Sequence, residues 1–160
     1  MKKEWIIFSF CLVLSTSLYA ATQTASAAKR QATTEESVYL SDLLKKQPYA
    51  NLWKTTVWDK VPDQKDPKFS WLKDGGTTTP ATTAKIGYET YHKIEGCKPH
   101  SCAGDDEVLV LMNNKKVMAL QLYTQSKGNV TNGQKLEKMY GSPTTLEQRY
   151  FDAWKKNFGH

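Results

Sequence analysis

Catalytic motifs are absent from this sequence. The chain has only three histidines, His92, His100 and His160, and it contains no G-x-S-x-G, H-E-x-x-H, P-loop or glycine-rich nucleotide motif. Adjacent carboxylates such as Asp105 and Asp106 do not identify an acid–base pair, because neighbouring side chains point apart. The sequence therefore predicts a protein that is not an enzyme and that needs no cofactor.

Arginine and runs of like charge are also scarce. The formal net charge is +6, yet the only arginines are Arg30 and Arg149, and no five consecutive residues carry the same sign. Nucleic-acid-binding proteins usually cluster their basic residues in a patch or stripe. The composition thus argues against nucleic acid as a partner.

A long apolar run is missing as well. The apolar stretch at residues 6–18 is too short for a membrane span of roughly 20 residues. Two lysines precede it and small residues follow it, which is typical of a signal peptide over residues 1–27, cut after Ala27 or alternatively after Ala20. A membrane anchor is the competing interpretation. We expect an exported chain without a membrane span.

Cysteine is rare, and export simplifies its count. Cys11 leaves with the signal peptide, so that Cys97 and Cys102 remain. Two cysteines in an exported protein most simply form one disulfide. The alternative is a zinc site formed by these two cysteines and His100, but the pattern lacks an obvious fourth ligand.

The N-terminal part of the chain is predicted to be helical after a flexible segment at residues 28–36. Residues 37–160 are expected to form a single domain. Ser37 is a possible N-cap of a first helix, and Pro48 can occupy the first position of a second. The apolar residues of these helices are Val38, Leu40, Leu43, Leu44, Leu52, Trp53 and Val57. Then follow a loop at 59–68, an apolar group at 69–72, a turn at 74–76 and an irregular stretch at 77–83.

The middle of the chain favours strands. One is expected from Ile86 to Gly96, and the apolar runs 108–112 and 117–123 predict two central strands of a hairpin. The asparagines between these runs tolerate the positive φ that tight turns need. Residues 124–135 are polar and are expected to form a loop.

The C-terminal segment predicts a helix that covers the sheet. Pro143 fits its opening turn, and Thr144 with Glu147 has the spacing of a capping box. The predicted buried face comprises Leu146, Tyr150, Ala153, Trp154 and Phe158, with Gly159 at the end. The fold class is therefore α+β: a central antiparallel meander with helices packed on it and one protruding disulfide-closed loop.

That loop, residues 97–102, is called the stapled loop below. Pro99 fixes its own φ and biases Lys98 away from helix, so that His100 is expected near the tip of a stiff loop. Ordering one side chain on binding costs about 0.5–1.5 kcal/mol, which a preordered loop largely avoids. A purely structural staple with an incidental histidine is the alternative.

Three segments carry a family resemblance. Gly96-Cys97-Lys98-Pro99-His100-Ser101-Cys102 resembles the C-K-P-H-D-C loop of the Ivy family, the inhibitors of vertebrate lysozyme that Gram-negative bacteria export. The stretch from Trp71 to Ala81 is similar to that family's W-x-x-x-G-G-T-x-T-P-A segment, and Glu89-Thr90-Tyr91 to its E-T-Y strand.

The resemblance implies a periplasmic inhibitor whose partner is a c-type lysozyme. In the family, the stapled loop enters the enzyme's active-site cleft, and its histidine hydrogen-bonds the catalytic carboxylates. Carried over, the inhibitory loop is Cys97, Lys98, Pro99, His100, Ser101 and Cys102, with His100 as the blocking residue. Whether the chain is a monomer or a homodimer stays open.

The chain departs from the family at Ser101, where the pattern has Asp. This keeps a second hypothesis open, that the protein modulates the bacterium's own lytic transglycosylases. A third hypothesis is a structural envelope-binding domain without an enzyme target. A basic inhibitor also gains no overall attraction to a basic lysozyme. Around the loop, however, Glu95, Asp105, Asp106 and Glu107 predict a locally acidic surface, opposed by Lys98.

Overall fold

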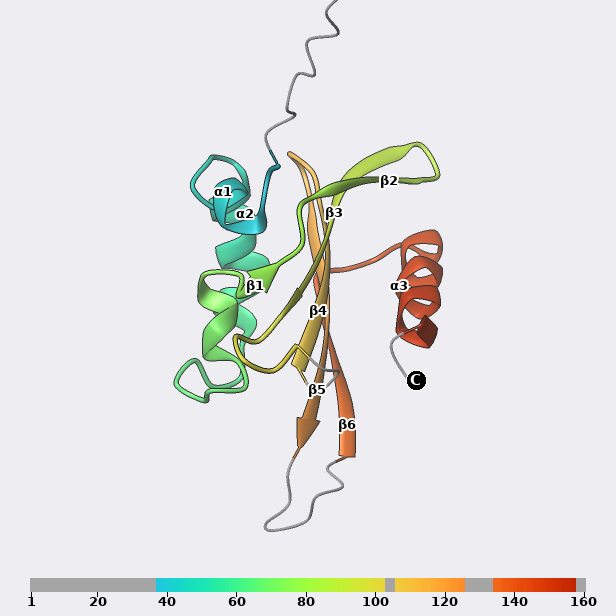
Figure 1. The fold of residues 1–160 in the computed structure, drawn as a ribbon. Helices are drawn as coiled ribbons and strands as arrows, with labels where there is room; N and C mark the ends of the chain where they lie inside the picture. The colour runs from blue at the N-terminus through green and yellow to red at the C-terminus, as the bar shows by residue number, and fades with distance from the viewer. Residues whose placement is uncertain (1–36, 103–105, 126–133, 158–160) are drawn as a thin grey trace, which may run out of the picture. The chain divides into compact units, whose positions relative to one another are not determined.

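Six antiparallel strands form the central sheet of the structure, a computed structural model that describes residues 37–102, 106–125 and 134–157 (Figure 1). The strands are β1 (Thr77–Thr78), β2 (Thr82–Ile86), β3 (Glu89–Cys97), β4 (Asp106–Met112), β5 (Val117–Gln125) and β6 (Gln134–Tyr140). From β3 to β6 they pair in chain order, and both β1 and β2 pair with β3. The predicted antiparallel meander is confirmed.

β4 and β5 are the central strands, as predicted. All residues of β4 are buried, because helices cover both faces of the sheet. Val108 and Val110 belong to the apolar cluster on one face, while Leu109 and Leu111 belong to the cluster on the other. This alternation follows from the period of two along a strand. It explains why β4 is apolar from Val108 to Met112, after the two acidic residues with which the strand begins.

The two faces are covered by different parts of the chain (Figure 1). On one face lie α1 (Leu40–Leu43), α2 (Tyr49–Thr56) and two short 3₁₀ helices, η1 (Trp58–Lys60) and η2 (Ser70–Lys73). On the other face lies α3 (Thr145–Asn157). The α+β class is thus confirmed. No helix in these described ranges is long and apolar enough to cross a membrane, and the predicted signal peptide and flexible N-terminus lie outside them.

The first helix begins later than predicted. Leu40 is its first residue and Tyr39 occupies the N-cap position, so Ser37 is not the cap. The backbone N–H of Tyr39 donates to the Asp42 carboxylate at 3.2 Å, which fixes this start. The second helix begins one residue later than predicted, because Pro48 occupies the N-cap position and Tyr49 is the first helical residue.

The segment before β3 differs from the prediction. Ile86 ends β2 instead of opening the next strand, because Gly87 and Tyr88 form a two-residue turn with Gly87 at φ +61°. The threonine run at 77–83, expected to be irregular, contributes to β1 and β2. β1 has no buried residue and β2 buries only Ala84 and Ile86, so the apolar alternation by which a strand is recognised in sequence is too short here.

β6 was missed for the same reason. Residues 124–135 were predicted as loop, yet β5 extends to Gln125 and β6 begins at Gln134. β6 is an edge strand that is only partly buried and whose sequence is mostly polar. Charged and polar residues are common on such edges because they discourage pairing with other chains.

The β4–β5 turn has the predicted place but another mechanism. Asn113 Oδ1 accepts hydrogen bonds from the backbone N–H groups of Lys115 and Lys116, both at 2.9 Å. Neither asparagine of the turn has positive φ. Asn113 thus stabilises the turn as a side-chain acceptor rather than through an unusual backbone conformation.

The C-terminal helix begins at the predicted capping box, and Trp154 is buried and Tyr150 partly buried as predicted, but the rest of the buried face differs. The capping box is present, with Thr144 N–H donating to Glu147 Oε2 at 2.6 Å. The buried residues are Glu147, Phe151 and Trp154, whereas Leu146 is 52% exposed. Ala153 is also exposed, and Phe158 and Gly159 lie outside the described residues.

Glu147 is the reason for this rotation of the buried face. Its carboxylate accepts hydrogen bonds from the Tyr91 hydroxyl on β3 and, at 2.6 Å, from Lys116 Nζ. Burial alone raises the pKa of this carboxyl, but the hydrogen bonds from Lys116, Tyr91 and Thr144 outweigh it and lower the pKa to about 2. A prediction of the buried face from apolar residues alone therefore missed Glu147, the residue that anchors the helix to the sheet.

Candidate functional site

The stapled loop leaves the sheet between β3 and β4. Cys97 ends β3 and pairs in register with Glu107, and the Lys98 N–H donates to the Asp106 carbonyl at 3.0 Å. The antiparallel ladder thus continues up to the base of the loop. Two strands of the sheet hold the base in place.

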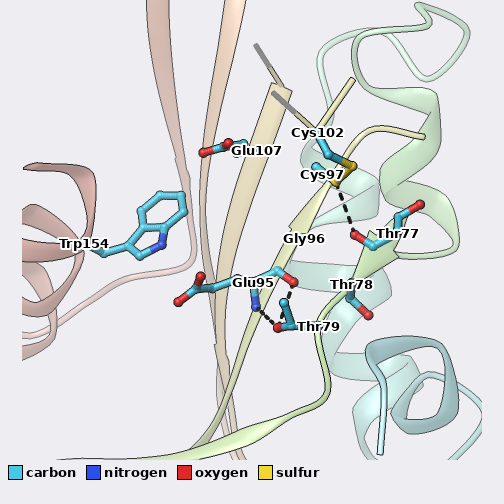
Figure 2. A pocket seen from close by; sticks show the side chains of 9 residues that line it. All are labelled: Thr77, Thr78, Thr79, Glu95, Gly96, Cys97, Cys102, Glu107 and Trp154. Atoms are coloured by element: carbon cyan, nitrogen blue, oxygen red, sulfur yellow. Dashed lines mark hydrogen bonds between the residues drawn. A yellow bond between two sulfur atoms is a disulfide. The ribbon is translucent and has the colours of Figure 1, made fainter. Parts of the chain in front are cut away.

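The predicted disulfide between Cys97 and Cys102 is formed, with the two Cα atoms 5.1 Å apart (Figure 2). Because each sulfur is bonded to the other, neither is available as a thiolate. The interpretation of Cys97, His100 and Cys102 as zinc ligands is therefore wrong for this state of the protein. A cysteine nucleophile is ruled out on the same ground.

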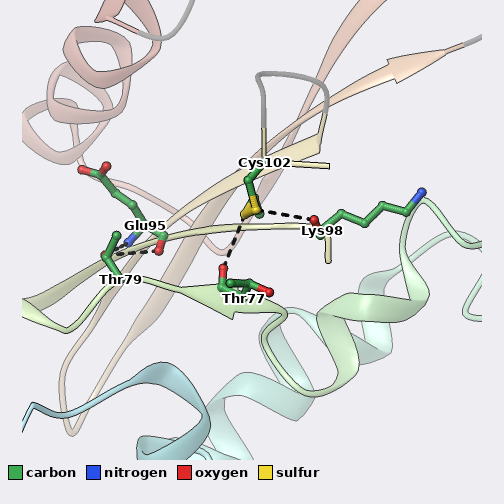
Figure 3. The surroundings of a disulfide bond; sticks show 6 residues. Thr77, Thr79, Glu95, Lys98 and Cys102 are labelled. Atoms are coloured by element: carbon green, nitrogen blue, oxygen red, sulfur yellow. Dashed lines mark hydrogen bonds between the residues drawn. A yellow bond between two sulfur atoms is a disulfide. The ribbon is translucent and has the colours of Figure 1, made fainter. Parts of the chain in front are cut away.

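β1 supports the disulfide from the side (Figure 3). The Thr77 carbonyl oxygen lies 3.7 Å from Cys97 Sγ, and the Lys98 carbonyl oxygen lies 3.8 Å from Cys102 Sγ. Disulfide sulfurs carry no hydrogen, so these are packing contacts. Gly76 permits the approach of β1, because a Cβ there would come within 2.7 Å of the Cys97 carbonyl oxygen.

His100 lies in a backbone conformation that histidine seldom adopts. Its φ is +67°, and it is the one non-glycine residue with positive φ among the described residues. The Ser101 N–H donates to the Lys98 carbonyl at 2.9 Å. Pro99 thus precedes a left-handed residue in a four-residue turn, the arrangement of a type II turn, in which glycine is usual at the place of His100.

The imidazole of His100 is placed at the surface by this turn. Both Pro99 and His100 are exposed, while Lys98 and Ser101 are partly buried. A left-handed non-glycine residue costs of order 1–3 kcal/mol and persists when surrounding structure imposes it; such residues cluster at functional sites. Here the disulfide and the turn hydrogen bond impose it. The sequence signal for this was Pro99 alone, which does not reveal the sign of the next φ.

The acidic surface predicted around the loop is partly neutralised. Lys93 Nζ lies 2.6 Å from Glu95 Oε1, and Lys98 Nζ lies 3.6 Å from Asp106 Oδ2. Lys98 therefore pairs with one of the acids that it was expected to oppose. Glu107 is only 8% exposed. Asp105 lies outside the described residues.

A pocket beside the disulfide was not predicted. It lies on the α3 face of the sheet, and Trp154 of α3 lines it together with Cys97 and Cys102 (Figure 2). Trp154 was predicted only as a core residue of the C-terminal helix. More than fifty residues separate it from the stapled loop in sequence, so no local pattern could connect the two.

Comparison with known proteins gives a partial match. No family model matches the chain. Two curated proteins are similar, the inhibitor of vertebrate lysozyme from Escherichia coli strain K12 and its counterpart from Escherichia coli O157:H7. The similarity is to lysozyme inhibitors. Each is 38% identical over 55 residues, which is 34% of this chain and 34% of the relative. The aligned segment thus spans about a third of these relatives, and it supports a partial match to the Ivy family.

Proposed function

We propose that this protein is an exported, periplasmic inhibitor of c-type lysozyme that inserts the stapled loop into the enzyme's active-site cleft. His100 is the blocking residue and hydrogen-bonds the catalytic carboxylates. The observation that carries the proposal is the exposed His100, held left-handed inside a disulfide-closed turn, in a chain that is partly similar to inhibitors of vertebrate lysozyme.

The chemistry of imidazole suits this role. A retaining glycosidase holds its two carboxyl groups about 5–5.5 Å apart. The two ring nitrogens of histidine point apart, and both donate hydrogen bonds when the ring is protonated. One histidine can therefore engage both carboxyl groups while the loop excludes the sugar.

Preorganisation supports the same proposal. The disulfide, the turn hydrogen bond and the ladder at the loop base fix the backbone on both sides of His100 before any partner arrives. The entropy cost of ordering this backbone therefore does not oppose association. A staple with an incidental histidine explains the disulfide and the turn, but it gives no reason for a histidine at the position where a type II turn usually has glycine.

The decisive experiment replaces the imidazole. We expect His100→Ala to weaken inhibition of a c-type lysozyme at least about a hundredfold, because a hydrogen-bonded group at the centre of an interface dominates its affinity. Inhibition is measured by lysis of bacterial cell walls against inhibitor concentration. His92→Ala is the matched control. His92 lies within β3, away from the stapled loop, and packs edge-on against Tyr49 of α2 with the ring centroids 5.9 Å apart.

Four outcomes separate the hypotheses. Loss of inhibition in His100→Ala but not in His92→Ala, with unchanged thermal unfolding, supports the proposal. Full inhibition by His100→Ala contradicts the mechanism. If the unmodified protein leaves lysozyme active but slows a lytic transglycosylase in the same assay, the modulator hypothesis replaces the proposed function. If the protein inhibits neither enzyme, the envelope-binding hypothesis is favoured.

A further inference from the structure

The pocket beside the stapled loop has a mixed lining that suits one kind of group. Its volume is about 270 Å³. Glu95 and Glu107 contribute carboxylates, Trp154 contributes an indole, and the disulfide contributes an apolar wall. The remaining lining comes from Gly96 and from the threonines of the β1 segment, Thr77, Thr78 and Thr79.

Three of the lining side chains, those of Glu95, Glu107 and Trp154, face the space between the sheet and α3 (Figure 2). The carboxylates of Glu95 and Glu107 point from neighbouring strands toward the side on which the indole of Trp154 lies. Glu107 is 8% exposed and Trp154 is 6% exposed, so both are largely shielded from water. Electrostatic attraction is stronger in such surroundings than at an open surface.

The size of the pocket limits its occupant. Pockets for small molecules and cofactors are typically about 300–1,000 Å³, and this one lies just below that range. A single long side chain is a better match than a sugar chain or a nucleotide. The two carboxylates select a cation, and the indole offers a flat face on which a cation can stack.

We infer that this pocket accepts an arginine side chain of the protein partner whose cleft receives the stapled loop. The inference rests on the proposed function and adds a second contact to it. Cys97 and Cys102 line the pocket and also close the loop, so a protein that surrounds His100 must pass close to the pocket mouth. Arginine fits better than lysine, because its planar guanidinium pairs in a fork with carboxylates and stacks on aromatic rings.

Lys93 does not preclude this occupant. Its ammonium lies 2.6 Å from Glu95 Oε1, and it lines a neighbouring hollow with Tyr150 and Asn157 rather than this pocket. A carboxylate offers about four acceptor sites on two oxygens, so one ion pair does not saturate it. Glu95 can therefore hold Lys93 on one side and a guanidinium on the other.

The pocket can be tested without any lysozyme. N-acetyl-arginine amide is titrated into the purified protein, and the indole N–H resonance of Trp154, assigned with Trp154→Phe, is followed by NMR. We expect a shift that saturates in the millimolar range. The citrulline analogue has nearly the same shape but no charge, and it should leave the resonance in place. Equal shifts from both compounds, or none from either, overturn the inference.

The second test measures affinity for a c-type lysozyme by titration calorimetry. Glu107→Gln and Glu95→Gln keep the shape of the side chain and remove its charge, and each should weaken binding about tenfold. The matched control is Glu137→Gln on β6, where Glu137 pairs with Lys155 at 2.7 Å, away from the pocket; its affinity should not change. Thermal unfolding of each variant verifies that it is folded.

The outcomes distinguish this inference from the proposed function. If His100→Ala loses inhibition but both pocket variants bind like Glu137→Gln, the pocket inference is wrong and the proposed function stands. If the protein does not bind lysozyme at all, the proposed function fails, and the arginine amide titration alone decides whether the pocket binds a guanidinium.

Discussion

The stapled loop and the C-terminal helix are both fastened to the sheet, one by a covalent bond and the other by a buried carboxylate. The disulfide holds a turn whose tip, His100, is exposed. Glu147 instead collects its partners inside the protein, where it is 4% exposed. The loop thus keeps a chemically versatile side chain available, whereas the helix anchor uses all its polar groups internally. We therefore expect the stapled loop to bind a partner and the helix anchor to contribute to the stability of the fold.

Removing the helix anchor should have the largest effect on stability. We expect Glu147→Ala to lower the free energy of unfolding by about 3 kcal/mol, because Lys116 and the Tyr91 hydroxyl lose their buried acceptor. Denaturant unfolding measures this, with the exposed Glu89→Ala as control. Under conditions in which the variant stays folded, His100-dependent inhibition should remain. A stability like that of the control would mean that the carboxylate does not anchor α3.

Acid should weaken the same anchor. The folded-state pKa of Glu147 is lowered from 4.5 to about 2, so its contribution is complete above pH 4.5 and is lost as the pH falls toward 2. The free energy involved is up to about 3 kcal/mol. Thermal unfolding between pH 6 and pH 2 should show a steeper decline for the unmodified protein than for Glu147→Gln. Parallel curves would contradict the pKa assignment.

Opening the staple should act on function more than on stability. Replacing both Cys97 and Cys102 by Ser should cost about 2 kcal/mol of stability, since the closed loop is short. Inhibition should weaken more than this loss of stability alone would explain, because no covalent bond then imposes the left-handed backbone at His100. The measurement is the lysis assay, with reduction of the unmodified protein as a parallel route. Equal inhibition before and after opening would refute preorganisation.

Ser101 should give the smallest effect. Ser101→Asp restores the acidic residue of the family pattern and should strengthen inhibition of a c-type lysozyme about fivefold, on the scale of one charge-assisted hydrogen bond. Ser101→Ala is the matched control and should differ little from the unmodified protein. Weaker inhibition by Ser101→Asp would indicate a target other than the one the family pattern implies.

Local patterns accounted for much of the fold. The capping box of Thr144 and Glu147, the helix after Pro48 and the turn at Asn113 were all recognised, because the interacting groups lie within a few residues of one another. β2 and β6 were not recognised. Edge strands derive their structure from hydrogen bonds to a neighbouring strand, and the few buried apolar residues of β2 and β6 give only a short or irregular apolar pattern.

The candidate site divides in the same way. The Cys97–Cys102 pair and the turn after Pro99 could be predicted from the stapled loop itself. The left-handed backbone of His100 could not, because Pro99 does not set the sign of the φ that follows it. The burial of Glu107 could not, because it depends on how β4 packs in the sheet.

For this protein, the sequence alone determined which cysteines pair, where the C-terminal helix starts and which residues form the loop around His100, since these follow from neighbours along the chain. The tertiary structure decided which face of α3 is buried, because Glu147 meets Tyr91 across 56 positions. It also brought Trp154 beside the disulfide to line a pocket with Glu95 and Glu107. Contacts between such distant segments depend on the packing of the whole sheet, which no local pattern records.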